Sequence, residues 1–171
     1  MDELTMDTEL WTAVLQDGAF AAVAAVGFGM ISNPPKRAIY MIALLGAVGH
    51  ACRYGMLHGV GLNLSVATFL ASMTIGLLSV FLAKLIRCPA EIMAFPALLP
   101  MIPGMYAYKT VLALMKFMLN SDVPHSELND YIIDIFRNGL TTIFVMCTLV
   151  IGMAVPLLIF KKVTFTRTKA K

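Results

Sequence analysis

The sequence predicts an all-α integral membrane protein with five transmembrane helices, and three observations lead to this fold class. Hydrophobic residues make up 59% of the 171 residues and charged residues only 13%, whereas roughly 25% of a soluble domain is charged. The mean hydropathy is +0.81. The apolar residues gather in segments close to the ~20 residues that a helix needs to cross a bilayer. Little length remains for a soluble domain, so we expect residues 1–171 to form a single membrane domain.

The expected spans follow from the apolar runs and from the turn residues between them. Asn33, Pro34 and Pro35 end the first run, because two consecutive prolines do not continue a helix. The stretch 126–136 places its apolar residues on one helical face, which predicts a short interfacial helix before the last span. The expected spans cover residues 11–31, 39–57, 64–86, 92–119 and 139–160.

The charges segregate along the chain and predict its orientation. An odd number of spans puts nine of the thirteen basic residues on one side, which the positive-inside rule makes cytoplasmic. Eight of the ten acidic residues then fall on the other side. We therefore expect the N-terminus outside and the C-terminus inside, with 161–171 as a basic cytoplasmic tail. The nine basic residues are Lys36, Arg37, Lys84, Arg87, Lys161, Lys162, Arg167, Lys169 and Lys171.

Motifs of other function classes are not found in the sequence. There is no HExxH, GxSxG or Walker A pattern, so we expect no enzyme and no nucleotide-driven pump. Cys52, Cys88 and Cys147 lack metal-ligand spacing, and we interpret all three as small packing residues. No metal, cofactor or nucleic-acid partner is expected.

The fourth expected span contains an unusual cluster of helix breakers. Pro96, Pro100, Pro103 and Gly104 lie within an otherwise apolar stretch, and proline both removes a backbone donor and clashes with the preceding turn. The cluster predicts two half-helices joined by unwound backbone, which is how many transporters build a substrate site at mid-membrane. A proline-kinked structural helix is the alternative.

Three polar side chains follow the cluster and suggest a binding site for a carboxylate. Tyr106, Tyr108 and Lys109 begin the second half-helix, whose start offers unpaired N–H groups and a positive dipole end. Together with Pro100, Pro103 and Gly104 they form the candidate substrate-binding set. In the alternative, Lys109 extends to the interface and the tyrosines form an aromatic belt.

Three ionisable residues lie inside the first two expected spans. Asp17 and Arg53 lie at similar depth by the 1.5 Å rise per residue, and His50 shares a helical face with Arg53. A pair between Asp17 and Arg53 would lower the cost of both charges in lipid. The three residues are candidates for a gate or for proton coupling. A structural ion pair and a packed histidine are the alternatives.

Three stretches carry a resemblance to a known family. They are Ala25–Arg53, Gly61–Gly76 and Phe95–Thr110, and they hold a GHxxR element (Gly49–Arg53) and a PxxPG element (Pro100–Gly104). Over almost its whole length the chain resembles the threonine/serine exporter family. It is more similar to the small subunit of the family's split, two-component form, the YjjB-like proteins.

The resemblance implies a multi-pass subunit of an export system in the bacterial cytoplasmic (inner) membrane. It implies a larger membrane subunit as partner and small carboxylate substrates, either threonine and serine or succinate, with which the split form is associated. The implied function is that of the small subunit of a secondary exporter in the lipid bilayer, while a higher oligomer remains open. The alternative is a non-transporting subunit that stabilises a larger transporter.

The orientation can be tested directly. Reporter fusions at Lys171 should be active only when the reporter works in the cytoplasm, because nine basic residues belong to that side. A fusion at the N-terminus serves as the matched control and should report the opposite side. Activity of the Lys171 fusion only outside the cytoplasm would contradict the predicted topology.

Overall fold

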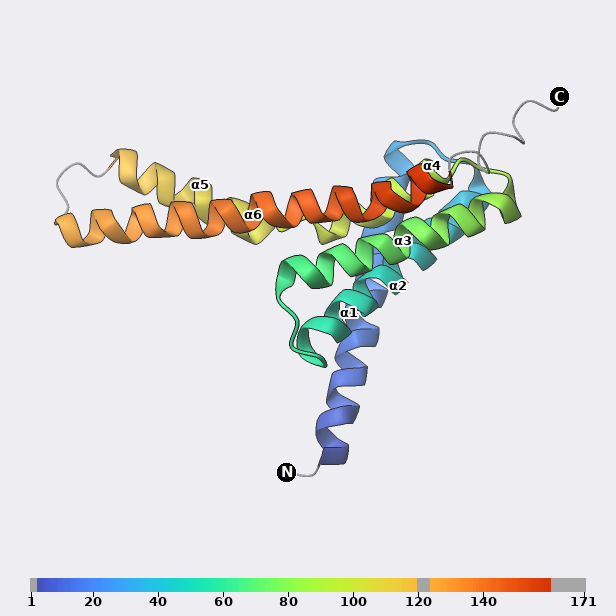
Figure 1. The fold of residues 1–171 in the computed structure, drawn as a ribbon, viewed down its shortest axis with the longest axis horizontal. Helices are drawn as coiled ribbons and strands as arrows, with labels where there is room; N and C mark the ends of the chain where they lie inside the picture. The colour runs from blue at the N-terminus through green and yellow to red at the C-terminus, as the bar shows by residue number, and fades with distance from the viewer. Residues whose placement is uncertain (1–2, 120–123, 161–171) are drawn as a thin grey trace. The chain divides into compact units, whose positions relative to one another are not determined.

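The computed structural model describes residues 3–119 and 124–160, and every regular element in these residues is a helix (Figure 1). The expected basic tail lies outside the described residues. The helices are α1 (Glu3–Ile31), α2 (Lys36–His58), α3 (Leu64–Ile86), α4 (Ala90–Leu98), the short 3-10 helix η1 (Leu99–Met101), α5 (Gly104–Leu119) and α6 (His125–Ile159).

Three described helices are long and apolar enough to cross a membrane. They are α1 from Thr8, α3 and α6, and a fourth span results if α4 with η1 and α5 count as one interrupted span. Helix α2 is not among them, because His50, Arg53 and the two basic residues at its start lower its hydropathy. The structure thus shows three candidate spans and up to four, where the sequence predicts five.

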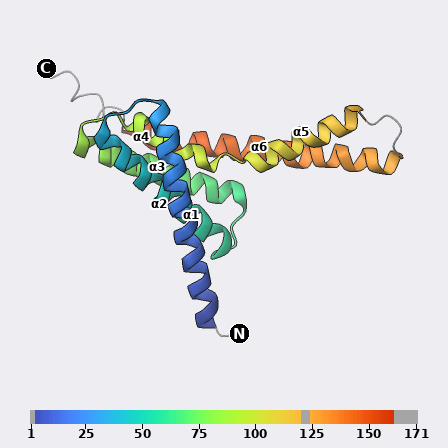
Figure 2. The ribbon, with the colours of Figure 1, turned by 180° about the vertical axis from the view of Figure 1, so that it is seen from behind.

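The contacts divide the chain into two compact units. One unit holds the chain up to Met101 together with the segment from Thr148, and the other holds Ile102–Cys147. In the first unit α2 packs against α1, α3 and α4 (Figures 1 and 2). In the second unit α5 lies alongside the first part of α6 in both views.

Small residues bring the helices of the first unit close together. A Cβ added to Gly46 of α2 would lie 2.7 Å from the Ala25 Cβ and 3.2 Å from the Ala21 carbonyl oxygen of α1. On α3, a Cβ at Gly76 would lie 2.9 Å from the Met153 carbonyl oxygen of α6. Close backbone approach of this kind is how helices associate where lipid removes the hydrophobic driving force.

Local signals explain both ends of α3. The Asn63 side chain accepts a hydrogen bond from the Val66 N–H (3.2 Å) and caps the first turn. At the other end Arg87 adopts the left-handed conformation, with φ of 56°, which stops the helix. The range Leu64–Ile86 is the one that the sequence predicts for the third span.

Two sequence expectations, one for α6 and one for the cysteines, are wrong. The interfacial helix at 126–136 is not separate, because α6 continues without a break from His125 to Ile159. Asn138 and Gly139 stay helical there, and the Asn138 side chain donates to the Asp134 carbonyl one turn back (2.8 Å). Cys88 is buried and Cys52 half-buried, but Cys147 is exposed among the apolar side chains of α6 and does not pack in a core.

Two matched glycine substitutions on α2 test the close packing. Gly46→Ala should lower the free energy of unfolding by about 1–3 kcal/mol, because the new methyl group overlaps Ala25. Gly55→Ala should raise it by about 0.5–1 kcal/mol, because nothing lies within 4 Å and alanine favours the helix. Thermal unfolding in lipid nanodiscs measures both. Equal effects of the same sign would show that α1 and α2 are not packed in this way.

Candidate functional site

The backbone leaves α-helical geometry between α4 and α5, where the prolines cluster. Helix α4 ends at Leu98, the 3-10 turn η1 follows, and α5 begins at Gly104. Pro103 has no N–H for the carbonyl of Leu99, which lies one helical turn before it. The N–H of Gly104 donates to the Ile102 carbonyl (2.8 Å) instead of continuing the helix. The segment therefore leaves backbone carbonyls that need other donors.

The expectation of free N–H groups at the start of α5, from Gly104 to Tyr106, is wrong for Gly104 and Tyr106. Gly104 donates to Ile102, and the Tyr106 N–H donates to the Pro103 carbonyl (3.1 Å). The tight turn at Ile102–Gly104 uses the donors locally, so they are not available to a ligand. Any anion bound here must rely mainly on side chains.

Arg53 supplies the donor that one of the interrupted carbonyls needs. Its Nη1 donates to the Met101 carbonyl oxygen at the end of η1 (2.9 Å). In an uninterrupted helix this carbonyl would accept from residue 105. The half-buried guanidinium of α2 thus closes the end of the interrupted helix, and a charge-assisted bond of this kind is stronger than a neutral one.

Asp17 pairs with His50 rather than with Arg53. The distance from the Asp17 Oδ2 to the His50 Nδ1 is 3.0 Å, and this is the only salt-bridge contact among the described residues. The predicted Asp17–Arg53 pair is therefore wrong in its partner. His50 and Arg53 share a face of α2, but His50 lies one turn closer to the middle of the helix, and Arg53 reaches η1 instead.

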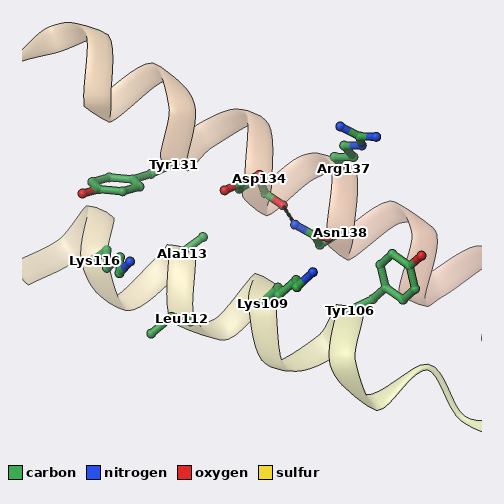
Figure 3. Close-up of a pocket in the computed structure, with 9 residues that line it drawn as sticks. All are labelled: Tyr106, Lys109, Leu112, Ala113, Lys116, Tyr131, Asp134, Arg137 and Asn138. Carbon is green, nitrogen blue, oxygen red and sulfur yellow. Dashed lines mark hydrogen bonds between the residues drawn. The ribbon is translucent and has the colours of Figure 1, made fainter.

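The second unit contains a cavity of about 530 Å³ between α5 and the first part of α6 (Figure 3). Its lining combines three basic side chains, one carboxylate and two tyrosines. Ala113 is buried at its base, and Leu112 provides an apolar wall. The lining residues are Tyr106, Lys109, Leu112, Ala113, Lys116, Tyr131, Asp134, Arg137 and Asn138.

The charges of this cavity favour an anion. Lys109 extends from α5 toward α6, and the Lys116 ammonium lies 6.0 Å from the centre of the Tyr131 ring (Figure 3). With Arg137 these residues give three positive charges against the single negative charge of Asp134. Apolar walls with a few convergent polar groups are typical of small-molecule sites. The arrangement suits a small molecule that carries a carboxylate.

The structure separates the residues of the candidate substrate site. Tyr106 and Lys109 line the cavity, whereas Tyr108 is 61% exposed and points elsewhere. Pro103 is buried in the turn before α5, Pro100 is half-buried, and Gly104 is exposed. These three residues shape the backbone and do not line the cavity.

Sequence reasoning missed most of the cavity lining. On α5 the spacing of Tyr106, Lys109 and Ala113 continues to Lys116 one turn later. On α6 the residues Tyr131, Asp134 and Asn138 recur three and four apart. This periodicity is visible in the sequence, but which two helices face each other is not.

The apolar helices define the class of the protein as a membrane protein, and the comparison with known families gives a finer assignment. The family model described as "Threonine/Serine exporter, ThrE" matches residues 17–159. The chain therefore belongs to the threonine/serine exporter family. Members of this family are transporters, so a membrane exporter is indicated. No solved structure matches the chain.

The bond between Arg53 and η1 can be tested by its effect on stability. Arg53→Met should lower the free energy of unfolding by about 1–3 kcal/mol, because it leaves the Met101 carbonyl without its donor. Arg53→Lys should restore part of the loss. Lys84→Met removes an exposed charge from α3 and should have little effect. Thermal unfolding in nanodiscs measures all three, and a wild-type value for Arg53→Met would contradict the assignment.

Proposed function

We propose that this chain is the small membrane subunit of a two-component secondary exporter. It moves small carboxylate-bearing metabolites, either a succinate-like dicarboxylate or threonine and serine, out of the cytoplasm with a larger membrane subunit of the same family. The observation that carries the proposal is the cavity between α5 and α6, whose lining contains three basic side chains and one carboxylate in a chain of an exporter family.

The cavity offers complementary groups for both kinds of substrate. For a zwitterion, Lys109 holds the carboxylate while Asp134 attracts the ammonium group. For a dicarboxylate, the second carboxylate takes the remaining cations, and Asp134 then opposes binding. The proposed substrate set is Tyr106, Tyr108 and Lys109 with the backbone shaped by Pro100, Pro103 and Gly104. The cavity adds Lys116, Asp134 and Arg137.

The proposed topology has five spans in a single membrane domain of the inner membrane, with the N-terminus outside and the C-terminus inside. Helix α2 is the least hydrophobic span, but its two ionisable residues at mid-helix face protein partners. His50 pairs with Asp17 and Arg53 with Met101. Because polar groups that are paired inside the bundle cost less in a membrane, a span can carry them. The interrupted pair α4–α5 supplies the fourth span.

The exposed apolar surface supports the proposal of a membrane partner. Along α5 and α6 many large apolar side chains are exposed, among them Met118, Phe136 and Phe144. Lipid or a second membrane protein covers such surface in a bilayer. We propose that the larger subunit covers part of it and completes the path of the substrate.

The charge of the cavity leads to a test with two substrates. Lys109→Met should lower efflux of a dicarboxylate about tenfold and efflux of threonine about threefold. Without Lys109 the dianion loses a charge-assisted bond and still meets the repulsion of Asp134. The zwitterion keeps Asp134 as a partner for its ammonium group. The measurement is efflux from vesicles that hold matched amounts of the chain assembled with its larger subunit.

Lys84→Met is the matched control, because Lys84 is exposed on α3 and does not line the cavity. It should export at the wild-type rate. Wild-type efflux of every carboxylate tried in Lys109→Met, with the assembled complex intact, would contradict the assignment. That result would favour the alternative, a subunit that stabilises a partner which transports alone.

A further inference from the structure

One buried polar atom of the first unit has no hydrogen-bond partner in the described residues. It is Nε2 of His50, whose side chain is about 7% exposed. The other ring nitrogen, Nδ1, faces the Asp17 carboxylate at 3.0 Å. An unpaired buried polar group is costly, so a native structure that keeps one needs a physical reason.

The contact with Asp17 determines which nitrogen carries the proton in the neutral ring. An ionised carboxylate only accepts hydrogen bonds, so Nδ1 must be the donor to Asp17. In the neutral ring Nε2 is then a bare acceptor. It becomes a donor only when the ring takes a second proton.

The backbone group that faces the ring is the carbonyl of Pro100, the middle residue of η1. The proline cluster has removed the usual donors of this carbonyl. Pro103, three residues ahead, has no N–H, and the Gly104 N–H donates to Ile102. In the neutral state His50 Nε2 therefore has no hydrogen to donate, and the nearby Pro100 carbonyl also lacks its helical donors.

Few other charges act on this ring from the elements around it. Asp17 comes from α1 and Arg53 from α2, and η1 carries no ionisable side chain. The single charged residue of α3 is Lys84 in its last turn, and that of α4 is Glu91 in its first turn. The segment of α6 from Thr148 to Ile159 holds none. Among charged groups, Asp17 and Arg53 therefore act on the ring, and they oppose each other.

We propose that His50 is a proton-binding switch that controls the interrupted segment between α4 and α5. When the ring is protonated, Nε2–H donates to the Pro100 carbonyl while Nδ1–H stays on Asp17. Side chains of α2 then bind two consecutive carbonyls of η1. His50 binds that of Pro100, and Arg53 binds that of Met101. When the proton leaves, the first of these bonds is lost and only Arg53 holds the segment.

The switch rests on the proposed export function for its role in transport. Residues 99–101 lead directly through Ile102 and Pro103 into α5, which carries Tyr106 and Lys109. Proton uptake and release at His50 would then alternate this segment between a tightly held and a loosely held state. This is what coupling of substrate movement to a proton gradient requires.

Amide hydrogen exchange of the full-length chain in nanodiscs tests the switch without any transport assay. From about pH 5 to pH 8, exchange of the amides of Leu99, Met101 and Ile102 should accelerate about tenfold after correction for the intrinsic effect of pH. His50→Gln, which does not titrate, should remove this pH dependence. His58→Gln is the matched control on the same helix, since His58 is exposed and stacks on Tyr54. It should keep the wild-type profile.

A second variant keeps the test decisive if His50→Gln does not fold. Asp17→Asn retains an oxygen that accepts from Nδ1–H but removes the negative charge. Because the carboxylate favours the protonated ring, its loss should move the exchange profile toward lower pH. A wild-type pH profile in either His50→Gln or Asp17→Asn would overturn the proposal.

Efflux measurements separate this proposal from the exporter function itself. If the assembled complex exports and His50→Gln leaves both the rate and its pH dependence unchanged, the switch is wrong and the exporter function stands. If no carboxylate is exported by the wild-type complex, the exporter function is wrong. The exchange profile still decides whether His50 is a switch.

Discussion

The hydrogen bond from Arg53 to the Met101 carbonyl is the interaction on which the rest of the first unit depends. A membrane segment can leave helical geometry only where protein or water satisfies the freed backbone groups. Arg53 does this from α2, the helix that also packs against α1, α3 and α4. Once its guanidinium is fixed on η1, the register of α2 places His50 against Asp17 of α1. The interrupted segment and the buried polar cluster are therefore one arrangement.

Close helix packing allows the groups of this polar cluster to pair inside the unit. Gly46 lets α2 approach the backbone of α1, and Gly76 lets α3 approach α6. At this separation the Asp17 side chain reaches His50 across the helix contact, so neither faces lipid alone. The close approach of α2 to α1 at Gly46 thus also brings Asp17 within reach of His50.

The sequence predicts helices well where a local signal ends them, as the Asn33-Pro34-Pro35 turn ends α1 and Asn63 caps α3. It fails where the outcome depends on tertiary partners. The Asp17–Arg53 pair follows from depth alone, and depth does not show that a carbonyl of η1 competes for the guanidinium. The prediction of free N–H groups at the start of α5 fails for a local reason. The Gly104 N–H closes a turn on Ile102 that the sequence does not reveal. The cavity forms only because α5 and α6 face each other, which the sequence does not show. Lys116, Asp134 and Arg137 could therefore not be predicted as lining residues.

The two groups of charges differ in a way that suits different tasks. Around His50 the charges are buried or half-buried, few and matched to individual protein atoms, so under the proposed switch a single proton changes the hydrogen bonds of η1. Between α5 and α6 the basic side chains are exposed and outnumber the one carboxylate, so the cavity keeps a net positive charge for a solute to neutralise. A group that must sense a proton needs burial, because solvent would supply its missing hydrogen bond. A group that must bind and release a metabolite needs access. The proline cluster lies on the chain between these two environments, so the segment that the proposed switch holds is the one that leads into the helix carrying Lys109.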